Sequence, residues 1–137
     1  MKTRTDVVSA CLRFSDAYED YPFDDPNWTA LRHRTNQRIF ALVFERDGKI
    51  WINLKAEPMR AEFWRAAYTA VLPGYHMNKR HWISVILDGS MSDAEIFPLI
   101  EDSYELGTVN LYAQNSMQAA KEKSRYAMEE SPRATSR

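Results

Sequence analysis

The chain has 137 residues and a mass of 16.0 kDa, the size of one ordinary domain. Apolar residues make up 45% of it and charged residues 27%, with only four Gly and six Pro, so collagen-like, low-complexity and disordered chains are disfavoured. The longest apolar run covers only residues 39–44, too short to cross a bilayer, and the single Cys11 has no partner for an internal disulfide. We therefore expect a soluble, cytoplasmic domain that makes no membrane contact.

The net charge of -1 conceals blocks of opposite sign along the chain. Residues 28–82 hold ten basic and four acidic residues, whereas residues 15–27 and 83–114 hold five and six acidic residues and no basic one. This layout permits a positive face on a near-neutral protein, which is the minimum that an electrostatic grip on phosphates requires. Mutual neutralisation of the blocks is the competing interpretation.

Apolar spacing predicts a first helix over residues 5–14, with Thr5 as its N-cap and Cys11 within its buried stripe. The proline-containing segment 15–27 is expected to be irregular, because each proline disfavours helix at the residue before it. Aromatic and β-branched residues separated by short polar turns then predict three strands. These strands are expected over residues 28–34, 38–45 and 49–55.

Pro58 opens a second predicted helix, whose apolar residues are expected to face the core. Strands are expected over residues 75–78 and 82–87, and a capping box of Ser92 and Glu95 begins a third helix. Pro98 should kink that helix or move its start. The apolar set of the second helix consists of Met59, Phe63, Ala66, Ala67 and Ala70.

The resulting order is helix, three strands, helix, two strands, helix. It predicts a two-layer α+β domain, with an antiparallel sheet and helices, over residues 1–112. Residues 113–137 are expected to form a polar C-terminal extension that is partly helical or disordered.

Asp47-Gly48 predicts a two-residue hairpin turn, so paired residues of the flanking strands should have numbers that add up to 95. One face of this hairpin is then almost wholly apolar and should face the helices. The other face alternates aromatic rings with long cations, as nucleic-acid-binding sheets do. The register of strand 28–34 stays open, since a three-residue turn puts Arg32 and Arg34 beside Arg38, whereas a two-residue turn buries Arg32.

No catalytic or metal-binding motif accompanies these elements. The spacing of His33, His76 and His81 does not match a metal site, and the sequence has no glycine-rich phosphate loop. Neighbouring carboxylates such as Asp24 and Asp25 point apart in regular structure. We therefore expect a non-enzymatic protein without metal or cofactor.

The segment Tyr75-His76-Met77-Asn78-Lys79-Arg80-His81-Trp82, followed by Val85, Leu87-Asp88-Gly89 and Ser103-Tyr104, resembles the signature of the MmcQ/YjbR family. The resemblance covers about residues 7–107 and implies the same order of helices and strands. It also implies a shape similar to bacterial secretion chaperones and two hairpins likened to a double-winged DNA-binding motif. It implies no catalytic residues.

The sequence thus favours a protein that binds double-stranded DNA with low sequence specificity. The alternative is a protein-interaction module, chaperone-like or a homodimer, that holds its protein partner on the aromatic and basic sheet face. The candidate contact residues are Arg32, Arg34, Arg38, Arg46, Lys49, Trp51, Lys55, Lys79, Arg80 and Trp82.

Overall fold

The structure, a computed structural model, describes the backbone of residues 1–124 and the side chains of residues 1–108. It confirms the expected α+β class with an antiparallel sheet, and Met1–Gly107 form one compact unit. Residues 108–124 belong to a second unit and continue the last helix, while the rest of the expected extension lies outside the described residues. The elements are α1 (Arg4–Cys11), β1 (Ala17–Asp20), β2 (Thr29–His33), β3 (Ile39–Arg46), β4 (Lys49–Lys55), α2 (Pro58–Ala67), β5 (Val71–Pro73), β6 (Trp82–Ile86) and α3 (Asp93–Ser124).

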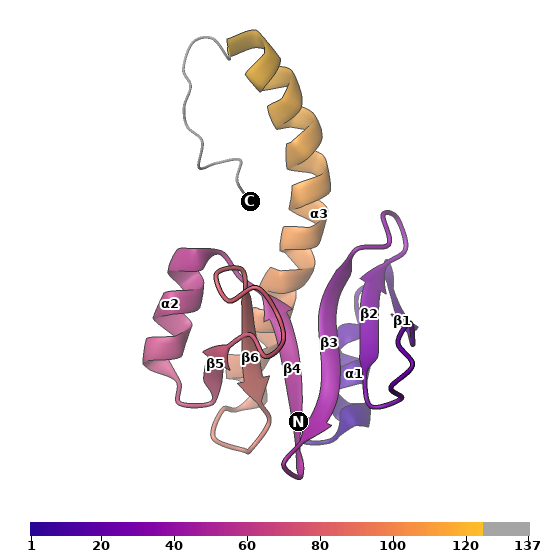
Figure 1. Cartoon of the computed structure of the whole chain (residues 1–137), viewed down its shortest axis with the longest axis vertical. Helices are drawn as coiled ribbons and strands as arrows, with labels where there is room; N and C mark the ends of the chain where they lie inside the picture. Colours follow the sequence, from indigo (N-terminus) through magenta and orange to yellow (C-terminus); the bar gives the residue numbers. More distant parts are fainter. Residues whose placement is uncertain (125–137) are drawn as a thin grey trace. The chain divides into compact units, whose positions relative to one another are not determined.

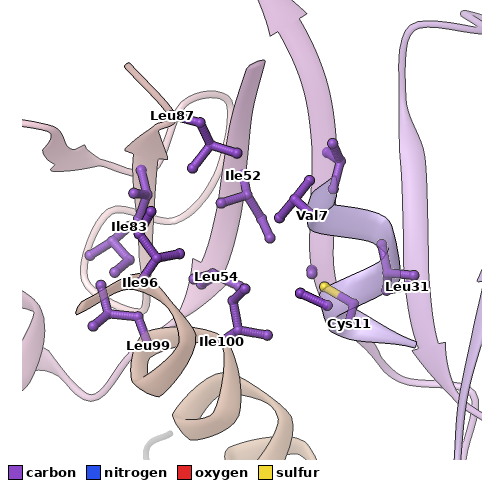
Figure 2. Packing of buried hydrophobic residues seen from close by; sticks show 14 of the residues in the cluster. Val7, Cys11, Leu31, Ile52, Leu54, Ile83, Leu87, Ile96, Leu99 and Ile100 are labelled. Atoms are coloured by element: carbon purple, nitrogen blue, oxygen red, sulfur yellow. The ribbon is translucent and has the colours of Figure 1, made fainter. Parts of the chain in front are cut away.

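The six strands form one sheet in the order β1-β2-β3-β4-β6-β5, with every neighbouring pair antiparallel (Figure 1). One face of the sheet carries the hydrophobic core. There Val7 and Cys11 of α1 and Ile100 of α3 lie in the same cluster as inward residues of β3, β4 and β6 (Figure 2). We call this the inner face and the opposite one the outer face.

Burial raises the pKa of the Cys11 thiol to about 12, as expected for a core cysteine rather than a reactive one.

The β3–β4 hairpin has the register that its turn predicts. Arg46 faces Lys49 and Ala41 faces Leu54, and Asp47 and Gly48 take positive φ values of 53° and 75°. The inward residues Ala41, Val43, Ile52 and Leu54 are fully buried, as strand alternation requires.

The first helix begins earlier than expected, and the segment after it is not wholly irregular. Thr3, not Thr5, caps α1, because Asp6 lies at the position where it can complete a capping box with Thr3. Residues 17–20, expected to be irregular, form β1 and pair with β2 from Ala17 opposite His33 onward. Pro22 restricts only the residue before it, so it does not prevent a strand that ends at Asp20.

The turn between β2 and β3 has neither of the two lengths considered from the sequence. The His33 N–H donates to the Arg38 carbonyl across a four-residue loop, and Gln37 in that loop has a φ of 61°. The register then shifts, since Leu31 faces Ala41 and Arg32 faces Ile39, which leaves Phe40 as the extra residue of a bulge. With Leu31 and His33 buried on the inner face, alternation places Arg32 on the outer face.

The prediction of a strand over residues 75–78 is wrong. The strand on the outer side of β6 is β5, and after it the chain leaves the ladder because the Tyr75 N–H donates to the Ser84 hydroxyl and His76 has a φ of 62°. Residues 74–81 form an irregular loop that we call the motif loop.

The second helix has the opposite orientation to the one expected, and of the expected apolar set only Ala70, which follows the helix, is buried. Ala61 is buried and Trp64 and Tyr68 pack on the core, whereas Met59 and Phe63 are exposed. Periodicity predicted this helix correctly but not its buried side, because large residues occur on both sides of it. The third helix has the expected capping box of Ser92 and Glu95 and begins at Asp93, with Pro98 inside it.

Candidate nucleic-acid interface

The rings expected to form a contact surface on the outer face are buried. Trp51 is 5% exposed and Phe44 is 1% exposed, because Trp28 stacks on Phe44 at 4.2 Å between centroids and Tyr75 covers it at 5.6 Å. Phe40 is also buried, and the bulge turns it toward Phe14 and Tyr104. Trp51 is therefore a packing residue rather than a platform for bases.

Polar residues of the sheet fix the motif loop over this ring cluster. Asn53 Nδ2 donates to the Tyr75 carbonyl at 2.9 Å, the Tyr75 N–H donates to Ser84 Oγ at 2.8 Å, and Ser84 Oγ donates to Asn53 Oδ1 at 2.5 Å. Asn53 and Ser84 are fully buried, and such buried polar groups stabilise only when they are paired. Within the loop, Lys79 Nζ donates to the carbonyls of Gly74 and Met77. Lys79, expected to contact phosphate, thus holds its own loop.

At the tip of the β3–β4 hairpin, Arg46 packs on rings while Lys49 is exposed. The Arg46 guanidinium lies 4.3 Å from the Tyr75 ring centroid and 4.9 Å from that of Trp51, and its NH1 is 3.9 Å from Asp47 Oδ2. These contacts orient Arg46 and partly neutralise it.

Arg32 is paired in the way that the competing interpretation of the charge blocks foresaw. Its Nε donates to Asp20 Oδ2 at 2.7 Å and its NH1 donates to the Gln37 carbonyl at 2.9 Å. Arg34, in the loop after β2, is exposed and lies over the Tyr18 ring at 5.3 Å.

At the other end of the sheet, the structure brings Lys55, Arg38 and Trp82 together. Lys55 faces Trp82 across β4 and β6, and its Nζ lies 5.7 Å from the Trp82 ring centroid. Burial lowers the pKa of Lys55, and the neighbouring charge of Arg38 lowers it further. Arg80 is exposed in the motif loop two residues before Trp82.

Ser103 of α3 positions this end of the sheet, although sequence reasoning assigned it no role beyond its place in the family signature. Its hydroxyl accepts from the Lys55 N–H at 2.9 Å and donates to the Phe40 carbonyl at 2.6 Å. It therefore ties β3 at the bulge to the last residue of β4.

Two ionisable residues near this end were not predicted to belong to the site. His33 Nδ1 lies 3.8 Å from Asp16 Oδ2, and the ring stacks on Tyr104 at 4.4 Å. Burial lowers the pKa of His33. The charges of Lys55 and Arg38 lower it further, and the Asp16 carboxylate acts in the opposite direction. The Asp16 carboxylate also accepts from the N–H and the hydroxyl of Thr35.

The ten candidate residues thus fall into separate groups rather than one patch. Lys49 and Lys55 are six residues apart on one strand, about 20 Å at about 3.3 Å per residue. We call the group Arg34, Arg38, Lys55, Arg80 and Trp82 the sheet-end group, and Arg46 and Lys49 the hairpin-tip group. Arg32, Trp51 and Lys79 have structural contacts of their own.

In the described part of the chain, no group of three or more His, Cys, Asp or Glu side chains could hold a metal ion. The same residues contain no helix that is both long and apolar enough to span a bilayer.

A six-stranded antiparallel sheet, with α1 and α3 packed on its inner face and a polar-anchored loop over the other, defines the class of fold. The chain belongs to the YjbR family, whose model matches residues 12–106, so the resemblance noted in the sequence is confirmed. It is 35% identical over 117 residues to the uncharacterized protein YyaQ of Bacillus subtilis. The aligned region covers 77% of this chain and 98% of that protein. It is 37% identical over 103 residues to the uncharacterized protein YjbR of Escherichia coli K12, which covers 75% and 85% of the two chains.

Solved structures share the fold. A crystal structure of the Deinococcus radiodurans protein DR2400 matches with a TM-score of 0.70 and 33% identity, over 80% of each chain. A crystal structure of a Pseudomonas syringae protein matches with a TM-score of 0.68 and 31% identity, over 77% of this chain and 98% of the other.

Proposed function

We propose that this chain is a cytoplasmic, non-enzymatic DNA-binding protein with low sequence specificity, and that its sheet-end group contacts the phosphates of double-stranded DNA. The observation that carries the proposal is the half-buried Lys55 beside Arg38, where burial and a like charge both act against the ammonium. An arriving phosphate would reverse that unfavourable interaction, because an opposite charge favours the ammonium form.

The arrangement of the sheet-end group supports contacts to the DNA backbone. Its cations come from three segments, namely the loop after β2, the last residue of β4 and the motif loop. Cations from separate elements at one end of a sheet can follow a phosphate backbone without reading the bases. Since the rings of Trp51 and Phe44 are buried, the proposal assigns them no stacking on bases.

Charge reversal at the two ends of the sheet tests the proposal. Replacing the exposed residues together, Arg34→Glu and Arg80→Glu, should weaken binding to a mixed-sequence duplex by about tenfold or more, because two phosphate contacts become repulsions. The matched control is Lys49→Glu at the hairpin tip, which is also an exposed cation and should have a much smaller effect. Fluorescence anisotropy would measure affinity and circular dichroism would verify folding.

Equal losses for both variants would mean that position on the sheet does not matter, and no duplex binding by the wild-type chain at low salt would refute the function itself.

A protein-interaction module is the second candidate. The observation that favours it is not the outer ring cluster, which is buried, but the exposed apolar side of α2.

A further inference from the structure

The solvent side of α2 carries the most exposed large apolar residues in the described part of the chain. Met59 is 81% exposed and Phe63 is 65% exposed, and a spacing of four residues makes them neighbours on the helix surface. Ala66 and Ala67 are exposed one turn further on. We call these four residues the α2 apolar face.

Rotation of the helix in place cannot bury this face without exposing another apolar side. Ala61 is buried, and Trp64 and Tyr68 pack against the core from the opposite side. The helix therefore has apolar residues on two opposite sides, a pattern typical of helices that are covered on both sides.

Carboxylates flank the α2 apolar face. Glu57 precedes the helix and Glu62 lies beside Phe63, and both are exposed. Arg60 NH1 donates to Asp102 Oδ1 of α3 at 2.8 Å, but Asp102 Oδ2 is buried without a hydrogen-bond partner among the described residues. Burial raises the pKa of Asp102. The charges of Glu57 and Glu105 raise it further, and the charge of Arg60 acts in the opposite direction. The two arginines of α2, Arg60 and Arg65, are thus outnumbered by the carboxylates of Glu57, Glu62, Asp102 and Glu105.

We propose that the α2 apolar face binds a cationic amphipathic segment of a protein partner, whose apolar side chains pack on Met59 and Phe63 and whose cations meet Glu57 and Glu62. The carboxylates around this face favour a cationic partner over a second copy of the chain or a nucleic acid. A second copy docked by two-fold symmetry would bring the same net-acidic surface against itself. Nucleic acid would meet those carboxylates with its phosphates.

A synthetic peptide with leucine and lysine at helical spacing serves as the probe, and a counterpart with glutamate in place of lysine is its control. The full chain should bind the lysine peptide and not the glutamate peptide in fluorescence anisotropy. Phe63→Ser should weaken binding about tenfold or more, since it removes the central apolar anchor. Glu62→Lys should also weaken it, and more so at low salt.

Leu12→Ser is the matched control, because Leu12 is an exposed apolar residue at the end of α1 and is 40% exposed. It should leave peptide affinity unchanged. Equal binding of the two peptides, or no effect of Phe63→Ser in a variant with native circular dichroism, would overturn the proposal. So would a wild-type dimer in analytical ultracentrifugation that Phe63→Ser converts to monomer, because a second copy would then be the occupant. Duplex affinity should be unaffected by Phe63→Ser, which separates this face from the sheet-end group.

Discussion

At the residue scale, the packing around His33 determines the pKa of its imidazole. Its ring is buried between Phe40 and Tyr104, and it lies near the cations Lys55 and Arg38. The carboxylate of Asp16 compensates only in part, because burial still lowers the pKa of His33. The folded protein therefore holds this imidazole in its neutral form at a pH where an exposed histidine would begin to be protonated.

A lowered pKa in the folded state gives His33 a defined effect on stability. The unfolded chain binds the proton more readily, so stability should be fully present above pH 6.5 and should fall as the pH drops from there through the folded pKa. Denaturant unfolding between about pH 7 and pH 5 measures this dependence, since the His33 reference value is near 6.5. His33→Gln should flatten it in that range. An unchanged slope in His33→Gln would show that other groups cause it.

At the scale of elements, α3 passes close to the sheet because residue 107 has no side chain. A Cβ on Gly107 would lie 2.4 Å from His33 Nε2 and 2.9 Å from His33 Cδ2. Asn36 at the β2–β3 loop also donates to the Gly107 carbonyl. This glycine thus allows the helix to pack against the loop end of β2.

Gly107→Ala tests that contact, and the sign of its effect distinguishes the explanations. Helix propensity alone would make the alanine more stable by about 0.5–1 kcal/mol, but the clash with a buried ring should make it less stable by about 1–3 kcal/mol. In a His33→Ala background the penalty should disappear, and a double-mutant cycle of unfolding free energies would measure the coupling. Additive effects would mean that the two residues do not constrain each other.

Elements that depend on neighbouring residues were predictable from the sequence, and those that depend on distant partners were not. The Asp47-Gly48 turn fixes its hairpin register, and Ser92 with Glu95 fixes the start of α3, because each signal is local. The bulge at Phe40 could not be foreseen, since its stabilising contact comes from Ser103, far along the chain. The motif loop likewise leaves the ladder for buried side chains of β4 and β6.

For the site, sequence pattern predicted which residues are cationic but not where their charges are used. Alternation placed Arg46 and Lys55 on the outer face, yet it could not show that Arg32 pairs with Asp20 of an unpredicted strand. It also could not orient α2, whose apolar residues lie on two sides.

At the scale of the whole molecule, we propose that separate surfaces of residues 1–107 make different contacts. The sheet-end group is cationic, whereas the α2 apolar face is bordered by the carboxylates of Glu57 and Glu62. A net charge of -1 does not argue against DNA binding, because a near-neutral protein can still carry a local cationic group.

The salt dependence of duplex binding tests the central claim most directly. If Arg34, Arg38, Lys55 and Arg80 contact phosphates, the logarithm of the binding constant should fall linearly with the logarithm of salt concentration, with a slope of about -3 to -4 between about 50 and 200 mM. The slope should shrink by about two units in the chain carrying both Arg34→Glu and Arg80→Glu, and stay unchanged in Lys49→Glu. A wild-type slope near zero, or the same slope in all three chains, would contradict the assignment of DNA phosphates to the sheet-end group.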